Sequence, residues 1–398
     1  MRALFLESID KIGAEAWNEI AGTDYPFTRY EYLYAMEQNT HEVDAACCSA
    51  SGWQPHHLAI EDENHNLLAV APLYIKAHSY GEYVFDFAWA DAYHRNNIDY
   101  YPKLLCAIPF TPATGPRLLL NKRIVDTQRG LAIRKFAVDA LKEHCFKEHI
   151  QSAHILFASK AEAADFTSQS LLIREAVQFH WFNIDANQEP YQDFEGFLGA
   201  LKARKRKAIR KERQQVMQQD LVIERLTGTQ LTDEVWKSFF LFYQRTYAKR
   251  SGHGGYLPEH FFRNVGSQLN QQIMLAAAFK RSDGENRMVA AALNFFSAET
   301  LYGRYWGCTE ETEFLHFELC YYQGIEFCIE KKMRKFDAGA QGEHKIQRGF
   351  IPVATRSAHY ILNEQFAAAI DNFITREKDY NRQYVEAVSE ALPYREVL

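Results

Sequence analysis

The sequence predicts a mixed α/β protein made of two halves in which the elements follow the same order. Each half contains helices, then a β-hairpin or meander, then a strand, a helix and another strand. A meander followed by a helix and a strand fits a mixed α+β sheet better than a doubly wound sheet, in which strands and helices alternate strictly. At about 100–200 residues per domain, the 398 residues divide into an N-terminal domain over 1–178 and a C-terminal domain over 179–398.

The first half is expected to open with two helices and a hairpin. Apolar residues recur at helical spacing between 7 and 38, and two apolar runs then flank a polar turn. The block over 79–120 is crowded with aromatic residues and holds four prolines, so it cannot be one regular element. The elements expected in order are helix–turn–helix over 7–38, strands over 56–61 and 66–75, the irregular block over 79–120, a helix over 127–148, a strand over 152–158, a helix or turn over 161–175 and a strand over 179–184.

The second half is expected to place a long helix before a three-stranded meander. The helix covers 194–216, and a later helix stops at a glycine-rich segment around 251–255. The other elements expected in order are a strand over 221–225, helices over 234–250 and 258–269, strands over 272–279, 288–297 and 300–308, a helix over 314–332, a strand over 334–338 and helix after 363.

The composition limits the kind of protein. A net charge of −6 argues against a protein that coats nucleic acid, although a local basic groove remains open. No window approaches the ~18 apolar residues of a membrane helix, and the N-terminus lacks the pattern of a signal peptide, so we expect a cytoplasmic protein without an integral membrane segment. Seven scattered cysteines indicate buried thiols. No Walker loop, GxSxG elbow, HExxH motif or metal-ligand cluster is present in the sequence.

A basic helix near the start of the second half is a candidate anion-binding element. Eight cations fall between 202 and 213 against one acid, Glu212, while Ile209 and Val216 belong to an apolar stripe. Like charges at i and i+4 repel, and a phosphate-rich partner would offset that repulsion. A solvated helix face is the alternative. The cations of this helix expected to bind donor phosphates are Arg204, Lys205, Arg206, Lys207 and Arg210.

A second candidate lies where the strand near 336 runs into a glycine-bearing loop. Polar groups just past strand ends often form the sites of α/β proteins, and glycines let backbone amides approach a ligand. The density of titratable groups favours a site over an ordinary surface loop with ion pairs, which is the alternative. The residues concerned are Asp337, Glu343, His344, Lys345 and Arg348.

Two further segments carry groups suited to an amine-bearing acceptor. His316 and Glu318 lie near the start of the helix expected over 314–332; the alternatives are a core histidine and a helix-dipole contact. In the aromatic block, carboxylates lie beside aromatic rings, which suits recognition of a cation, and a packed irregular subdomain is the alternative. The acceptor-binding residues expected in this block are Glu82, Asp86, Trp89, Tyr93 and Tyr101.

Two segments resemble those of Fem-type aminoacyl transferases, which add amino acids from aminoacyl-tRNA to peptidoglycan precursors. RKRKAIRKERQQVMQQDLVIERL resembles their R-x-x-I-x-K-x helix and the short strand after it. Their Y-D-x-x-G strand and F-K-x-G-F loop resemble Phe336-Asp337-Ala338-Gly339 and His344-Lys345-Ile346-Gln347-Arg348-Gly349-Phe350. The whole chain is most similar to the bacterial FemAB-like, or peptidoglycan biosynthesis/recognition, family of the GNAT acyltransferase superfamily.

The resemblance implies two tandem GNAT-like domains and an N-acyltransferase that passes an acyl or aminoacyl group to an amine. The donor is then a co-substrate, aminoacyl-tRNA or acyl-CoA, with no resident cofactor, and a cell-wall precursor is a candidate acceptor. Two departures keep substrate identity open: there is no room between Val216 and Leu221 for the coiled-coil arm of several Fem enzymes, and the loop carries an extra residue and a second cation, Arg348. The alternatives are an acyl-CoA-dependent acetyltransferase acting on a small molecule or peptide, and a non-catalytic peptidoglycan-recognition module.

The resemblance also suggests roles for individual residues. Lys345, which matches the Fem lysine, is expected to stabilise the oxyanion or leaving oxygen, and Asp337 or Glu343 to orient the amine or accept its proton. His344 joins this catalytic set, and Arg304 and Arg348 join the basic helix in holding donor phosphates. We therefore expect the Lys345 loop and the basic helix to face one crevice.

Overall fold

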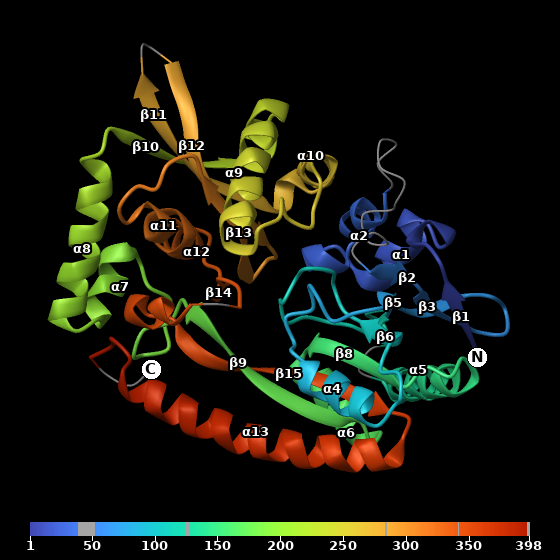
Figure 1. Ribbon diagram of the computed structural model, residues 1–398. Coiled ribbons are helices and arrows are strands. Elements are labelled where there is room, and N and C mark those ends of the chain that lie inside the picture. The colour runs from blue at the N-terminus through green and yellow to red at the C-terminus, as the bar shows by residue number, and fades with distance from the viewer. Residues whose placement is uncertain (39–51, 125–126, 283–284, 341, 396–398) are drawn as a thin grey trace. The chain divides into compact units, whose positions relative to one another are not determined.

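The computed structural model describes residues 1–38, 52–124, 127–282, 285–340 and 342–395 (Figure 1). The chain divides into two compact units: unit 1 consists of Met1–Val177 and Ala354–Tyr384, and unit 2 of Gln178–Val353 and Val385–Leu398. Residues 354–384 therefore pack with the first unit, and not with the second domain to which the sequence pattern assigned them. No helix within the described ranges is long and apolar enough to cross a membrane.

The strands of unit 1 form two groups. Their bounds are β1 (Arg2–Leu6), β2 (Trp53–Pro55), β3 (His57–Glu61), β4 (Leu67–Ala71), β5 (Leu73–Lys76), β6 (Lys103–Cys106), β7 (Leu119–Leu120), β8 (Ser152–Ala158) and β15 (Ile351–Ile361). One group has the antiparallel order β1-β3-β4-β7, and the other the order β15-β8-β6-β5-β2, in which β6 and β8 are parallel. Because Pro72 has no N–H for a sheet hydrogen bond, the single strand expected over 66–75 is divided between the two groups.

The helices of unit 1 bury apolar stripes in its core. They are α1 (Ala14–Ala21), α2 (Tyr30–Glu37), α4 (Phe87–Arg95), α5 (Gln128–Lys147), α6 (Lys160–Ser168) and α13 (Glu364–Glu390, which belongs to unit 1 as far as Tyr384), with 3₁₀ turns η1 (Ile9–Lys11) and η2 (Pro26–Thr28). Ile133, Ala137 and Leu141 of α5 recur at helical spacing and share a core with Ile155 of β8. The helices expected over 127–148 and after 363 are confirmed, whereas the sequence pattern missed β1 and β15.

The strands of unit 2 form an antiparallel meander followed by a crossover. They are β9 (Leu172–Phe182, which enters unit 2 at Gln178), β10 (Leu221–Thr227), β11 (Ile273–Ser282), β12 (Glu285–Phe296), β13 (Thr300–Cys308) and β14 (Lys335–Asp337). Their order is β10-β11-β12-β13-β14-β9, with β14 parallel to β13. The expected meander is confirmed, and with it the mixed α/β class. Ala276, Ala277 and Ala278 pair with Ala292, Ala291 and Ala290 in a ladder of small, buried residues.

The helices of unit 2 range from single turns to the 19 residues of α9. They are α7 (Phe194–Ala200), α8 (Ala203–Met217), α9 (Asp233–Ser251), α10 (Glu259–Gln268), α11 (Leu315–Phe317), the π-helical turn η5 (Glu318–Tyr322) and α12 (Gln323–Glu330), with 3₁₀ turns η3 (Gly228–Gln230), η4 (Asn270–Gln272) and η6 (Glu343–Arg348). The single helix expected over 194–216 is wrong, because Leu201 is extended and the Lys202 N–H donates to the Pro393 carbonyl at 2.7 Å. At Gly307 of β13, a Cβ would lie 2.2 Å from the Phe242 carbonyl oxygen, so glycine lets α9 lie directly on the sheet.

Candidate active site

Strand β14 carries Asp337 into the interior of unit 2. Asp337 is 1% exposed, and its Oδ1 accepts a 2.9 Å hydrogen bond from the Gly339 N–H. The register of β14 with β9 sets Asp337 opposite His180, whose Nε2 lies 3.5 Å from Asp337 Oδ1. Burial lowers the pKa of His180 to about 4, so its ring is neutral at pH 7. Although burial raises the pKa of Asp337, neighbouring groups that include Arg304 outweigh it and hold the pKa below its ordinary value, so the carboxylate stays charged.

Lys345 lies on η6 and is also buried. Its Nζ donates a hydrogen bond to the Gly339 carbonyl. Burial lowers the pKa of Lys345 to about 8, against the opposing effect of Asp337. Gly339 and Gly342 have φ angles of 86° and 108°, in the region that favours glycine, so the loop between β14 and η6 requires both. Lys345 on η6 therefore carries an ammonium group that is charged at neutral pH and loses its proton above about pH 8.

His344 and Glu343 lie on the exposed side of η6, and His344 belongs to an aromatic cluster. His344 Nε2 lies 2.7 Å from Tyr321 OH, and its ring centroid lies 5.8 Å from that of His316. Burial lowers the pKa of His316 to about 3, so this ring is neutral at pH 7. The predicted residues His316 and His344 thus lie together, although they belong to different elements.

The two arginines expected outside the basic helix have different surroundings. Arg348 is 7% exposed, and its Nη2 donates to both carboxylate oxygens of Glu212, at 2.9 and 3.0 Å. Its charge is therefore balanced inside unit 2, a structural role that the sequence did not predict. Burial and the charge of Arg304, on β13, both lower the pKa of Lys345. The Arg304 guanidinium therefore lies near the Lys345 ammonium group.

Helix α8 contacts η6 directly through its inner face. Lys205 Nζ donates to Gln347 Oε1 across this contact. The basic helix and η6 therefore lie side by side, and the crevice that we expect them to share stays a prediction.

Two further predicted cations of α8 have partners nearby. Arg210 pairs with Glu195 of α7, and Arg206 donates to the Leu201 carbonyl at 3.4 Å. Three exposed cations of α8 form no hydrogen bond or ion pair within the part of the chain that the structure describes; they are Arg204, Lys207 and Lys211.

The helix expected over 314–332 contains the π-helical turn η5, a feature that often marks functional segments. Its first residue, Glu318, is 4% exposed. Arg213 Nε and Nη2 donate to the two Glu318 oxygens at 3.0 and 2.9 Å. Glu318, which we expected to contact the acceptor, is thus engaged by α8 inside unit 2.

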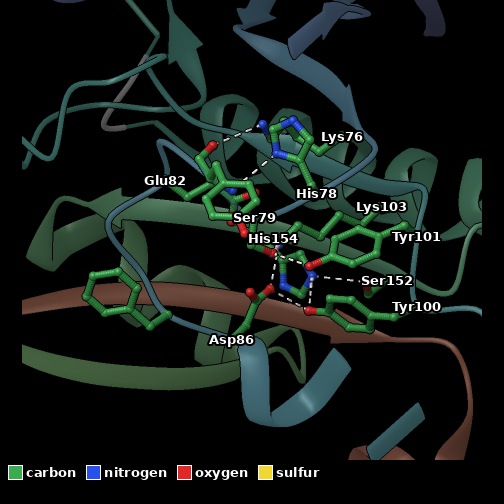
Figure 2. A network of polar contacts seen from close by, with 12 residues as sticks. Lys76, His78, Ser79, Glu82, Asp86, Tyr100, Tyr101, Lys103, Ser152 and His154 are labelled. Carbon is green, nitrogen blue, oxygen red and sulfur yellow. Dashed lines mark hydrogen bonds and ion pairs between the residues drawn. The ribbon is translucent and has the colours of Figure 1, made fainter. Parts of the chain in front are cut away.

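Figure 2 shows a buried polar network in unit 1 that is centred on Lys103 of β6. Lys103 Nζ donates to Glu82 Oε2 at 2.9 Å, to Asp86 Oδ2 and to Ser79 Oγ at 2.7 Å. The carboxylates of Glu82 and Asp86, which we predicted to hold the amine of an acceptor, therefore hold an ammonium group of the chain itself. Burial raises the pKa of Glu82 to about 7; for Asp86, burial is outweighed by the charge of Lys103, which helps to lower the pKa to about 2.

The network continues from Asp86 through Tyr100 to His154 (Figure 2) and on to His359. Tyr100 OH donates to Asp86 Oδ2 at 2.6 Å and lies 3.2 Å from His154 Nε2. His154 Nδ1 in turn lies 2.7 Å from His359 Nδ1, across the pairing of β8 with β15. Burial lowers the pKa of His154 to about 3, so this chain of side chains adds no positive charge at pH 7.

The other acceptor residues expected in the aromatic block pack around this network. Trp89 lies edge-on to His359, with ring centroids 5.0 Å apart, and Tyr101 OH lies 2.7 Å from Ser79 Oγ. Tyr93 stacks on Phe366 of α13 at 3.9 Å. Five of the seven predicted acceptor residues thus belong to unit 1, whereas His316 and Glu318 belong to unit 2.

Sequence reasoning missed His180 and the inward role of Glu212. The signal for His180 was that it is the one polar residue of the run Phe179–Phe182, whose other residues are aromatic. Glu212 was the single acid in a run of cations. Across the described ranges, no three histidine, cysteine or acidic side chains are arranged to hold a metal ion. Free thiols lie at 106, 145, 308, 320 and 328, and Cys47 and Cys48 lie outside the described residues.

The chain matches the family model FemAB_like, described as peptidoglycan biosynthesis/recognition, over residues 8–396. No curated protein matches it. Among solved structures it is similar to FemX, at 12% identity and a TM-score of 0.52, over 93% of this chain and 100% of that chain. It is also similar to L-PGS from Bacillus licheniformis, at 9% identity and a TM-score of 0.46, over 78% of this chain and 85% of that chain. A tandem GNAT protein from the clavulanic acid biosynthesis pathway is similar at 9% identity and a TM-score of 0.41, over 91% of this chain and 98% of that chain. The family match and the FemX likeness bear out the fold class that the resemblance implied.

Proposed function

Because the chain belongs to the FemAB-like family and is an acyltransferase of the Fem type, we propose that unit 2 passes an aminoacyl group from aminoacyl-tRNA to the amine of a peptidoglycan precursor. We place this reaction in the cytoplasm. The observation that carries this proposal is the buried ammonium group of Lys345 on the loop after β14, beside Asp337 and the charge of Arg304. A fixed cation in the interior is suited to a reaction in which negative charge develops on an oxygen.

The chemistry needs a neutral amine, a held carbonyl and a place for negative charge. The amine nitrogen attacks the carbonyl carbon of the donor ester, and the electron pair of the carbonyl moves onto its oxygen. Lys345 stabilises this oxyanion, a contact worth roughly 3–4 kcal/mol. The carbonyl re-forms as the bond to the ribose oxygen breaks. The amine gives its proton to Asp337 or Glu343, and the ribose oxygen takes up a proton from that carboxyl group or from solvent.

The outer face of α8 favours a polynucleotide donor over acyl-CoA. Arg204, Lys207 and Lys211 are exposed and occupy one side of the helix, three and then four residues apart. At a rise of 1.5 Å per residue they span about 10 Å along the helix. Cations spread over this length suit the separate phosphates of an RNA strand better than one compact pyrophosphate.

The test is transfer by the purified full-length chain, with aminoacyl-tRNA or acyl-CoA as donor and an amine-bearing muropeptide precursor as acceptor. We expect turnover with aminoacyl-tRNA, and a loss of at least about a hundredfold in Lys345→Met, which keeps the length of the side chain but removes its charge. Lys237→Met, on the exposed side of α9, is the matched control.

Thermal unfolding of each variant shows whether the fold is kept. Wild-type turnover in Lys345→Met would refute the role of Lys345. Turnover with acyl-CoA alone supports the acetyltransferase alternative, and binding of the muropeptide without turnover supports a recognition module.

A further inference from the structure

Helix α8 carries a carboxylate on its inner face. Glu212 is the only acid among the fifteen residues Ala203–Met217. Ile209 and Val216 lie three residues before and four residues after it, and both are buried, so Glu212 shares the face that docks on unit 2. An acid that faces inward from a basic helix points away from the cations of the outer face and toward a partner in the interior.

That partner is a ring of hydrogen bonds with Arg348 and Tyr322. Arg348 Nη2 donates to Glu212 Oε1 at 2.9 Å and Oε2 at 3.0 Å. Arg348 Nε donates to Tyr322 OH at 3.0 Å, and the Tyr322 hydroxyl donates in turn to Glu212 Oε2. Arg348 is buried and Glu212 is half-buried, and charge-assisted bonds in such surroundings are strong and directional. The ring therefore fixes α8, η5 and η6 to one another.

Arg348 passes this constraint to the backbone beside Lys345. Its Nη1 donates to the His344 carbonyl at 2.9 Å, and its guanidinium lies 3.3 Å from the centroid of the Phe317 ring. His344 directly precedes Lys345, whose Nζ reaches back to the Gly339 carbonyl. A shift of the Arg348 guanidinium therefore moves the peptide unit that holds Lys345 in its buried position.

A separate set of contacts anchors α8 itself. Arg213, the next residue, binds Glu318 with two nitrogens and donates from Nη1 to Glu326 Oε1 at 2.6 Å. Together with the buried Ile209 and Val216, these bonds keep the helix docked without Glu212. The loss of the Glu212 charge is thus expected to act on η6 and not on the placement of α8.

We infer that Glu212 is a positioning residue that sets the place of Lys345 through Arg348 and the His344 carbonyl. The inference rests on the proposed function in so far as Lys345 acts on the acyl carbonyl. It divides the work of α8 between two faces: the outer face binds the donor, and the inner face holds the loop that carries the reacting ammonium group.

The first test is a comparison of Glu212→Gln with the wild type in the transfer assay. Glutamine keeps the length of the side chain but loses the charge that binds Arg348. We expect kcat to fall about tenfold to a hundredfold, the cost of a misplaced group, while the KM for aminoacyl-tRNA stays within about twofold. Glu386→Gln, the same change on the exposed side of α13, is the matched control and changes neither value. A wild-type kcat in Glu212→Gln, or a loss confined to KM, overturns the inference.

The second test needs no activity, so it separates this inference from the proposed function. Hydrogen exchange is followed for the amides over 342–350, and an amine-reactive reagent titrates Lys345 across pH, read by mass spectrometry. In Glu212→Gln we expect faster exchange over this loop, unchanged exchange over α8, and a labelling midpoint that rises from about 8 toward 10.5 as Lys345 leaves its buried position.

If the wild type transfers nothing from either donor, the proposed function fails, and exchange and labelling still decide the role of Glu212. Arg348→Lys, which loses the fork that reaches both Glu212 and His344, is the second variant and decides the question if Glu212→Gln does not fold. Exchange and labelling that match the wild type in the folded variant overturn the inference.

Discussion

The Lys103 network makes the stability of unit 1 depend on pH through one carboxyl group. Lys103, Glu82 and Asp86 would carry a net charge of −1 if all three were ionised, and all are at most 4% exposed. Burying a carboxylate is costly, and for one of the two this cost outweighs the attraction of Lys103 and of Lys76, which is also buried, so one carboxyl keeps its proton. Burial and the neighbouring Asp86 assign that proton to Glu82, whose pKa is about 7. Glu82→Gln replaces the protonated acid with a neutral amide of the same shape.

The magnitude follows from the rise in the pKa of Glu82 between the unfolded and the folded chain. A rise from 4.5 to about 7 corresponds to about 3 kcal/mol, at about 1.4 kcal/mol for each pH unit. The folded state binds this proton more tightly, so its contribution to the free energy of unfolding is complete below pH 4.5. The contribution declines as the pH rises toward 7 and is lost above it. The glutamine variant has no proton to lose there and escapes the decline.

The assay is denaturant unfolding of both proteins from pH 5 to pH 8.5. The unfolding free energy of Glu82→Gln minus that of the wild type is expected to grow by about 2–3 kcal/mol over this range, because part of the full change lies below pH 5. Other titrating groups, including Asp86 with its pKa of about 2, cancel in the difference. Asp91→Asn, which removes an exposed carboxylate from α4, is the control with a flat difference. Parallel pH profiles for Glu82→Gln and the wild type would refute the reasoning.

Three further outcomes follow from the charges described above. Lys345 has a pKa of about 8, so the kcat of transfer should decline above that pH as the ammonium group loses its proton. Lys345→Arg should lack this alkaline decline, and a decline shared by both proteins contradicts the prediction. Lys103→Met leaves two buried carboxylates without their cation, so denaturant unfolding should show a loss of about 3–5 kcal/mol, and an unchanged stability contradicts it. Removal of Lys207 and Lys211 should weaken the salt dependence of RNA binding, measured by titration with an RNA hairpin at several salt concentrations. The slope of the logarithm of the binding constant against the logarithm of the salt concentration should become shallower by about 0.9 for each lost phosphate contact, and an unchanged slope contradicts this prediction.

The sequence indicated the elements whose signals are local. The meander over 272–308 and the helix after 363 have clear periodicity, and both are confirmed. The sequence pattern missed β1, which is only five residues long, and β15, which begins at Ile351 soon after η6 ends at Arg348. The long helix over 194–216 is interrupted at Leu201 because a distant segment, Pro393, takes the Lys202 N–H. No local pattern reveals a hydrogen bond to a residue so far along the chain.

In the candidate site, the sequence indicated the residue types but not the partners that those residues contact. Lys345 and Asp337 were apparent from their place after an apolar strand. Their environment was not, because the burial that lowers the pKa of Lys345 depends on packing from several elements. Likewise, Glu82 and Asp86 were recognised as acids beside aromatic rings, but the sequence does not say that Lys103 is the cation between them. Two arginine–carboxylate pairs, Arg348 with Glu212 and Arg213 with Glu318, join residues more than a hundred positions apart.

The return of residues 354–384 to unit 1 has a consequence for synthesis on the ribosome. All seven residues of β8 are buried, and one of its neighbours is β15, which is translated only after almost all of unit 2. At 5–20 residues per second, the nascent chain waits roughly 10–35 s between the emergence of Val177 and that of Ala354. Throughout that interval β8 presents an unpaired apolar edge, the kind that invites aggregation. We expect a fragment that ends at residue 178 to aggregate, because β8 then lacks its neighbour β15.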